Sequence, residues 1–191
     1  MEKFKNKYTI KSSRLQGYDY SQNGIYFVTI CTKGREHFFG EIENEIMNVS
    51  DIGKIANQFW QEIPKHFPFV NLDEFIIMPN HVHGIIEINW NIIDKPESVE
   101  TQNFASLHGV EYKQYKNKFG PQSKNLSSII RGFKVGVKKY ATMNNVNFAW
   151  QSRFYDHIIR NDESLNKIRE YVITNPKMWE RDRNNLENVF M

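Results

Sequence analysis

Hydrophobic and polar positions follow a strand-like pattern in three parts of the 191-residue chain. Residues 24–33 are rich in β-branched and aromatic side chains and close on a Lys-Gly pair, which predicts a central strand followed by a turn. Residues 71–78 and 81–88 have the same character, and only Pro79-Asn80 separates them. Because such a dipeptide is typical of a tight turn, these two segments predict a β-hairpin.

Three other segments repeat their apolar residues at helical spacing behind a residue that can cap a helix. The first predicted helix begins at Ser50-Asp51, and its apolar stripe is Ile52, Ile55, Ala56, Phe59 and Ile63. The second begins at Ser127 or Ser128, with the stripe Ile129, Ile130, Phe133, Val137 and Tyr140. The third begins at Asp162 or Glu163, with the stripe Leu165, Ile168, Tyr171 and Val172. Residues 150–160 are interpreted as a strand. The order strand, helix, hairpin, helix, strand, helix predicts an α+β fold, a ferredoxin-like antiparallel sheet with helices packed mainly on one face.

Neither pattern extends through residues 89–124, a polar stretch that contains two prolines and two glycines. This stretch is longer than most connections in a compact domain, so it predicts a mobile insert. Hydrophobic residues make up 40% of the whole chain and charged residues 25%. That composition suits one compact domain, and we therefore expect a single catalytic domain over residues 1–191 with an insert at about 89–124.

Composition also indicates where the protein resides. The single cysteine, Cys31, cannot form an internal disulfide, and its neighbours are those of a buried strand, which predicts a role in core packing. No apolar run approaches the length of a membrane span, and the first residues lack the apolar segment of a signal peptide. We therefore expect a cytoplasmic protein that does not bind a membrane.

Two histidines carry the first chemical signal, in the sequence Met-Pro-Asn-His-Val-His-Gly that ends at Gly84. Residues i and i+2 of a strand point to the same face, so His81 and His83 lie side by side while Val82 faces the core. Two imidazoles held in this way can share a divalent ion. The alternative is a pair of partly exposed polar residues with no metal.

The third predicted helix carries the second signal. Tyr171 and Asn175 are four residues apart and share a helical face, so an amide can reach a metal ion while a phenol sits beside it. A phenol has a reference pKa of about 10 and attacks poorly at neutral pH without a metal or a base. The alternative is that Tyr171 only packs the helix on the sheet and that Asn175-Pro176 ends the helix.

Basic and aromatic residues supply candidates for DNA binding. Arg131, Lys134 and Lys138 form one stripe of the second predicted helix and can face phosphates, although many basic helical faces are simply solvated. Within the insert, aromatic residues alternate with lysines and could stack bases, although an ordinary loop has the same composition. These insert residues are Tyr112, Tyr115 and Phe119, with Lys113, Lys116 and Lys118.

The last predicted strand holds two further candidates. His157 can approach the active site or the scissile phosphate, or it can be a hydrogen-bonded structural residue. Tyr155 is the rival nucleophile, but it lies on a strand and has Ile159, not Asn or Gln, four residues later. We therefore favour Tyr171 as the nucleophile, and for His157 we favour the structural role and keep a place beside the active site as the alternative.

Several segments, taken in order, resemble the REP-associated tyrosine transposases, a branch of the single-tyrosine HUH transposases. The matching segments are YFVTICTKGREHFFGEI, FIIMPNHVHGIIEI, SSIIRGFKVGVKK, WQSRFYDHIIR and REYVITNPKMW. Together they cover nearly the whole chain except residues 89–124. The combination is far more specific than any one of its parts.

The resemblance implies a domain that binds single-stranded DNA, often beside a hairpin, and cleaves it to leave a 5′-phosphotyrosine and a free 3′-hydroxyl. His81 and His83 fall on the HUH histidines, Tyr171 falls on the nucleophile, and Asn175 falls on a third metal position that is Gln or Asn in relatives. Mg²⁺ or Mn²⁺ is the implied ion. Relatives act as two-fold dimers or as monomers, so a homodimer stays open.

Two other functions remain open at this stage. One is a catalytically silent nucleic-acid-binding regulatory module of the same fold, although His81, His83, Tyr171 and Asn175 are all intact. The other is a metal-dependent nuclease that uses water in place of the tyrosine. Because a strand transferase stores the broken bond as a phosphotyrosine, a covalent protein–DNA adduct distinguishes it from both.

Overall fold

The computed structural model describes residues 14–15, 17–92, 124–182 and 184–185, together with the backbone of β1 (Lys3–Phe4) and β2 (Lys7–Tyr8). Most of the predicted insert lies outside these residues, including the tyrosines, phenylalanine and lysines between residues 112 and 119. Of the range 89–124, the structure describes residues 89–92 and 124. Trp90, in the short helix η2 (Trp90–Ile92), stacks on Phe69 with ring centroids 4.0 Å apart and donates a hydrogen bond to the Ser21 carbonyl.

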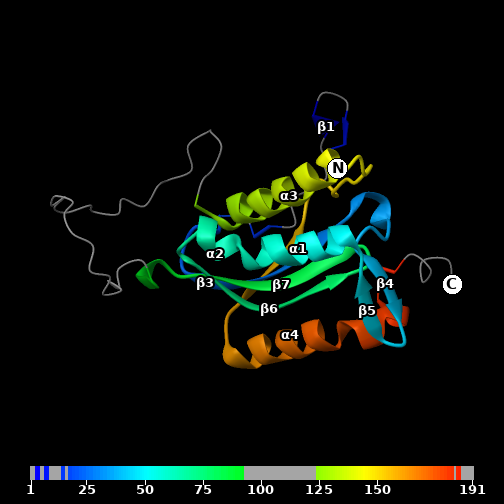
Figure 1. The fold of residues 1–191 in the computed structure, drawn as a ribbon. Coiled ribbons are helices and arrows are strands. Elements are labelled where there is room, and N and C mark those ends of the chain that lie inside the picture. Colours follow the sequence, from blue (N-terminus) through cyan, green and yellow to red (C-terminus); the bar gives the residue numbers. More distant parts are fainter. Residues whose placement is uncertain are drawn as a thin grey trace, which may run out of the picture.

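A four-stranded antiparallel sheet forms the centre of the protein, with strand order β6-β7-β3-β8 (Figure 1). Its strands are β3 (Gly24–Cys31), β6 (Val70–Met78), β7 (His81–Ile88) and β8 (Tyr155–Ile159). The predicted central strand pairs with both β7 and β8, and β6 and β7 form the predicted hairpin, closed by a Met78–His81 pair. The sheet thus has the antiparallel, ferredoxin-like order that the sequence indicated.

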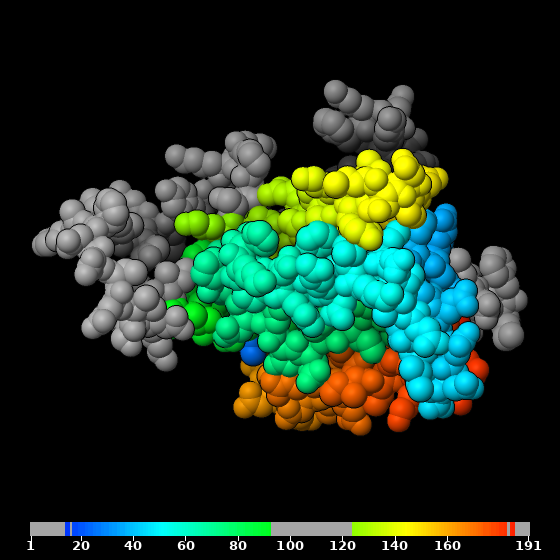
Figure 2. Space-filling view, in the orientation of Figure 1, coloured from blue at the N-terminus to red at the C-terminus, as the bar shows by residue number. Residues whose placement is uncertain are grey.

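Helices cover both faces of this sheet. On one face lie α1 (Asp51–Gln61), α2 (Ile63–His66) and α3 (Leu126–Met143), and on the other lie α4 (Asp162–Thr174) and the short helix η3 (Asn175–Arg181) (Figure 1). The predicted α+β class is confirmed, with most helical layers on one face. In the space-filling view, α1 and α3 make one continuous surface and α4 a separate one (Figure 2).

The helix starts follow from their caps. Ser50 accepts a hydrogen bond from the backbone N–H of Gly53, as the sequence predicted for α1. The start of α3 precedes the predicted one because Asn125 and Ser128 form a reciprocal capping box.

No helix in the described ranges has the length and apolar character that a membrane crossing requires.

The strand predicted over residues 150–160 is shorter than expected and begins at Tyr155. Trp150 makes only an isolated bridge with Thr32, since its indole packs against Phe133 and donates a hydrogen bond to the Lys134 carbonyl. Two backbone hydrogen bonds, from Lys33 N–H to the Ala149 carbonyl and from Gln151 N–H to the Cys31 carbonyl, hold this bridge at the sheet edge, and the chain leaves the ladder between Trp150 and Tyr155. Cys31 is half-buried at the end of β3, so it contributes less to the core than predicted.

A small hairpin of β4 (Gly40–Glu43) and β5 (Ile46–Val49) has no counterpart in the sequence prediction. Its turn uses Asn44 and Glu45 with positive φ angles of 51° and 65°, and lacks the Asn-Gly pair that usually marks a tight hairpin.

Two apolar clusters hold the layers together. The larger one lies between the sheet and α1 and α3, and it includes Trp60, whose ring packs directly on the backbone of β7 at Gly84. The smaller one lies between the sheet and α4 and consists of Phe27, Ile85, Ile159, Leu165 and Val172. This smaller cluster fixes α4 over the face of the sheet that carries the candidate chemistry.

Candidate metal centre and nucleophile

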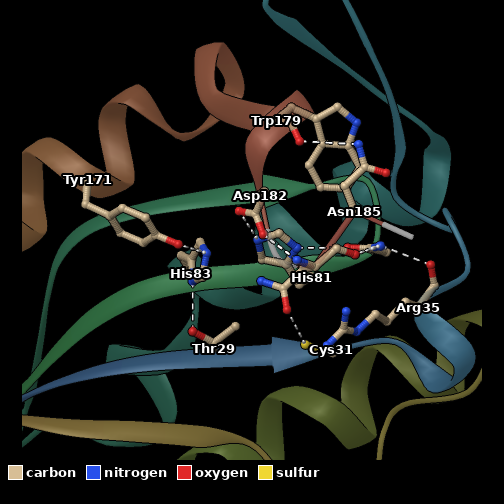
Figure 3. Close-up of polar contacts among 11 residues, drawn as sticks. Thr29, Cys31, Arg35, His81, His83, Tyr171, Trp179, Asp182 and Asn185 are labelled. Carbon is tan, nitrogen blue, oxygen red and sulfur yellow. Dashed lines mark hydrogen bonds and ion pairs between the residues drawn. The ribbon is translucent and has the colours of Figure 1, made fainter. Parts of the chain in front are cut away.

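His81 and His83 lie next to each other on the α4 side of β7, while Val82 points into the larger core (Figure 3). Their ring centroids are 4.4 Å apart, and their exposed fractions are 0% and 1%. Complete burial excludes the alternative of a partly exposed polar pair. Buried imidazoles need polar partners or a metal, and both histidines have such partners.

The Nδ1 atom of each ring is held by a neighbouring side chain (Figure 3). Thr29 Oγ1 lies 2.9 Å from His83 Nδ1, and Asn80 Oδ1 lies 2.8 Å from His81 Nδ1. The Asn80 amide nitrogen donates to the carbonyls of Arg35 and Asn184, so its oxygen must be the atom that faces His81. His81 therefore carries its proton on Nδ1 when neutral and directs the Nε2 lone pair into the site.

Asp182 lies opposite that lone pair. Its Oδ2 atom is 4.0 Å from His81 Nε2, and the ligand atoms of His81, His83 and Asp182 all lie within 4.8 Å of one another. Asp182 is itself buried. The carboxylate charge so close to an imidazole nitrogen favours a cation between the two atoms. The three side chains form a group that could bind a metal.

Sequence reasoning missed Asp182. It follows η3, where its backbone N–H donates to the Trp179 carbonyl, and the Trp179 ring lies over His81 with centroids 6.1 Å apart. No periodic pattern connects it with the histidines a hundred residues earlier in the sequence, so only the fold reveals the contact.

Tyr171 projects from α4 toward the same histidines (Figure 3). Its hydroxyl lies 3.2 Å from Nε2 of His83, and its ring packs edge-on against Phe27. The side chain is 41% exposed, so solvent and substrate can reach it. One chain thus brings together a phenol and an imidazole that lie 88 residues apart in the sequence.

Asn175 lies one helical turn beyond Tyr171, where α4 passes into η3. It is 1% exposed, and neither polar atom of its amide has a hydrogen-bond partner among the described residues. A buried amide without a hydrogen bond costs roughly 1–3 kcal/mol. A ligand that bonds this amide would recover part of that free energy. Asn175 is thus one helical turn from Tyr171, but it forms no hydrogen bond with either histidine.

The predicted basic stripe lies on α3, on the opposite face of the sheet. Arg131, Lys134 and Lys138 line a groove of about 940 Å³, along with further cations and aromatic rings. These further residues include Arg14, Lys139, Trp150, Arg153 and Phe154. Lys134 and Lys138 also donate hydrogen bonds to the carbonyls of Gln151 and Phe148, and burial lowers the pKa of Lys134. Two of the three predicted phosphate contacts therefore also fasten a loop to α3.

The register of β8 places His157 on the same face of the sheet as His83. Thr29 of β3 pairs with His83 on one side and with Tyr155 on the other, and Phe27 pairs with Ile85 and with His157. His157 is exposed, so it is not a buried structural histidine. It lies two strands away from β7, in the row formed with Phe27 and Ile85, which is next to the row that contains His83.

No protein-family model matches the chain. A Haemophilus influenzae protein that is named only as uncharacterized is 41% identical over 174 residues, which are 91% of this chain and 91% of that protein. A second protein of that organism, whose name assigns it provisionally to the REP-associated tyrosine transposases, is 24% identical over 159 residues, covering 83% of this chain and 73% of its own.

A solved structure of a REP-associated tyrosine transposase bound to a REP hairpin has a similar fold. The TM-score is 0.53 at 17% identity, and the match covers 87% of this chain and 73% of that one. This likeness shows a shared fold.

Proposed function

We propose that the chain acts as a REP-associated tyrosine transposase, which cleaves and rejoins single-stranded DNA near hairpins through a 5′-phosphotyrosine intermediate, and a 24% identical relative and a shared fold support this proposal. The observation that carries the proposal is the Tyr171 hydroxyl, 3.2 Å from His83 Nε2 and next to a buried group of metal-ligating side chains. A nucleophile beside a metal-ligand group is the arrangement that this chemistry requires.

The donor set fits a divalent metal ion. His81 and His83 would supply two imidazole nitrogens, with the Asn175 amide as the third ligand and the Asp182 carboxylate as a further oxygen. Mg²⁺ or Mn²⁺ is the ion implied by the family, and two imidazoles suit Mn²⁺ better than Mg²⁺. When bound, the ion would neutralise charge on the phosphate and lower the pKa of a coordinated phenol.

The protein's own groups would then carry out the transfer. The Tyr171 oxygen forms a bond to phosphorus while the bond between phosphorus and the 3′-oxygen breaks, and the phenol proton leaves as the 3′-oxygen gains one. Because one phosphodiester bond replaces another, a 3′-hydroxyl can attack the phosphotyrosine in reverse and rejoin DNA without a nucleotide cofactor. Tyr171 reaches His83 of its own chain, which supports an active site built within one chain.

The groove along α3 is our proposed site for the phosphate backbone of the hairpin or strand. Six basic residues line it, namely Arg14, Arg131, Lys134, Lys138, Lys139 and Arg153. Such a concentration of cations favours a polyanion although the net charge of the whole chain is only +3. The solved relative with a similar fold carries a bound REP hairpin, which supports this class of ligand.

Incubation of the protein with labelled single strands that contain hairpins, in the presence of Mn²⁺, tests the function. We expect a covalent adduct on a denaturing gel, lost in Tyr171→Phe and retained in the matched variant Tyr155→Phe. Cleavage without an adduct would indicate a nuclease that uses water. Binding without cleavage would indicate the catalytically silent DNA-binding module.

A further inference from the structure

We propose that Tyr155 and His157 of β8, with Phe27 of β3 beside them, form a subsite that binds a nucleotide next to the scissile phosphate. We call these three residues the β8 shelf. Tyr155 would stack on an unpaired base, and His157 would donate a hydrogen bond to a neighbouring phosphate oxygen. The inference rests on the proposed function, because it assumes a single-stranded DNA substrate at Tyr171.

Strand register places the shelf at the same level as the metal-ligand group. Thr29 is paired with His83 on β7 and with Tyr155 on β8, so the three side chains form one row across adjacent strands. Neighbouring strands lie about 4.8 Å apart, which puts the backbone of Tyr155 roughly 10 Å from that of His83.

The ring contacts connect the shelf directly with the nucleophile. Phe27 lies between two tyrosines, with its ring centroid 6.0 Å from that of Tyr171 and 6.4 Å from that of Tyr155. Phe27 is 7% exposed, whereas Tyr171 and Tyr155 are 41% and 42% exposed. Two accessible phenol rings therefore flank one buried ring on the same face, and α4 packs over β6 and β7 beside them.

The segment before Tyr155 connects the shelf with the basic groove. Arg153 and Phe154 line the groove on the α3 side, and the guanidinium of Arg14 lies 4.9 Å from the centroid of the Phe154 ring. Tyr155, the next residue, begins β8 and faces the histidine side. A strand that leaves the groove and passes over the β8 edge would meet Tyr155 before it reaches Tyr171.

The chemistry of these side chains suits an unstacked nucleotide. An exposed aromatic ring stacks on any base, because every base has a π-face, and such stacking is largely independent of sequence. His157 is exposed two residues further along the same face, where a ring N–H can reach a phosphate oxygen. The shelf would thus align the strand for in-line attack while leaving sequence selection to other contacts.

The test measures DNA binding in a Tyr171→Phe background, so that no covalent step interferes. A set of oligonucleotides carries 2-aminopurine at successive positions around the cleavage site, and its fluorescence is quenched where the base stacks on a ring. We expect quenching at one position adjacent to the scissile phosphate, lost in Tyr155→Leu and kept in Tyr155→Phe. Tyr155→Leu should also weaken binding about 5- to 150-fold, the range that alanine substitution gives for one base stack.

The control is Tyr140→Leu, a half-buried tyrosine of α3 on the other side of the sheet. Circular dichroism and Mn²⁺ affinity without DNA should be the same for all Tyr155 variants, which separates the shelf from folding and from the metal site. Tyr155→Trp should bind at least as tightly as the parent. Equal binding by Tyr155→Leu and Tyr155→Phe would overturn the proposal, as would quenching that persists without the ring. A wild-type protein that forms no adduct but retains this quenching would refute the proposed catalysis and leave the subsite intact.

Discussion

Thr29→Val is the substitution that most directly tests how the metal-ligand group is built. Valine has nearly the shape of threonine, and residue 29 is 3% exposed, so the change removes little except the hydroxyl 2.9 Å from His83 Nδ1. Without that partner, a neutral His83 gains by moving its proton to Nε2, where the Tyr171 oxygen lies 3.2 Å away. The nitrogen that should bind metal then carries a proton.

The expected magnitude follows from the general effect of such partners. Loss of a residue that orients a metal-binding histidine typically weakens metal affinity 10- to 100-fold, which corresponds to about 1.4–2.7 kcal/mol. Isothermal titration with Mn²⁺ at fixed pH measures this change. The matched control is Thr142→Val on α3, which removes an exposed hydroxyl that donates to the Lys138 carbonyl. A folded Thr29→Val protein with Mn²⁺ affinity within twofold of wild type would refute the reasoning.

Three further predictions concern α4, β7 and Asp182. Arg169 of α4 makes a two-pronged ion pair with Asp73 of β6, at 2.9 and 2.6 Å, so Asp73→Asn should slow adduct formation without changing DNA affinity. Arg169 lowers the pKa of Asp73, so the ion pair stabilises the fold above the unfolded pKa of about 4. Above that pH, urea unfolding should show a lower free energy of unfolding for Asp73→Asn than for wild type. The difference should vanish as the pH falls through the lower pKa of the folded state. Gly84→Ala puts a Cβ 2.1 Å from the Trp60 ring and should destabilise the protein by about 1–3 kcal/mol in thermal unfolding. Asp182→Asn should weaken Mn²⁺ binding measured by titration while the fold, followed by circular dichroism, is unchanged.

Each of these predictions has a clear control. Lys167→Met breaks an exposed ion pair with Glu163 on the same helix and should leave adduct formation unchanged. Gly136→Ala places its Cβ no closer than 3.4 Å to Phe59 and should be neutral or stabilising, because alanine favours a helix. Asp51→Asn removes an exposed carboxylate far from the histidines and should not alter Mn²⁺ affinity. Reversed results in any pair would contradict the corresponding assignment.

The sequence predicted those features that depend on local spacing. The two histidines of β7 share a face because a strand has a period of two, and Tyr171 and Asn175 share a face because a helix brings residues four apart together. The hairpin and the capped helices were likewise encoded locally. The fold class followed from the order of these elements.

Other features depend on contacts between distant segments and could not be predicted in this way. Asp182 approaches His81 only because η3 turns back over the sheet, and the Asp73–Arg169 ion pair depends on which strand lies below α4. The predicted last strand was too long because the core packing of Trp150 overrides the strand propensity of its neighbours. Such outcomes are settled by tertiary packing.

Gly84 gives the site a protection that its own ligands do not supply. This residue directly follows His83, and the Trp60 indole fills the space above its backbone from the opposite side of the sheet. A slip of β7 by two residues would bring Val82 or Ile86 under that indole, and a slip by one would turn both histidines toward the wrong face. The Trp60 ring, on the opposite face of the sheet, thus helps to fix the register of β7 and with it the spacing of the two imidazoles.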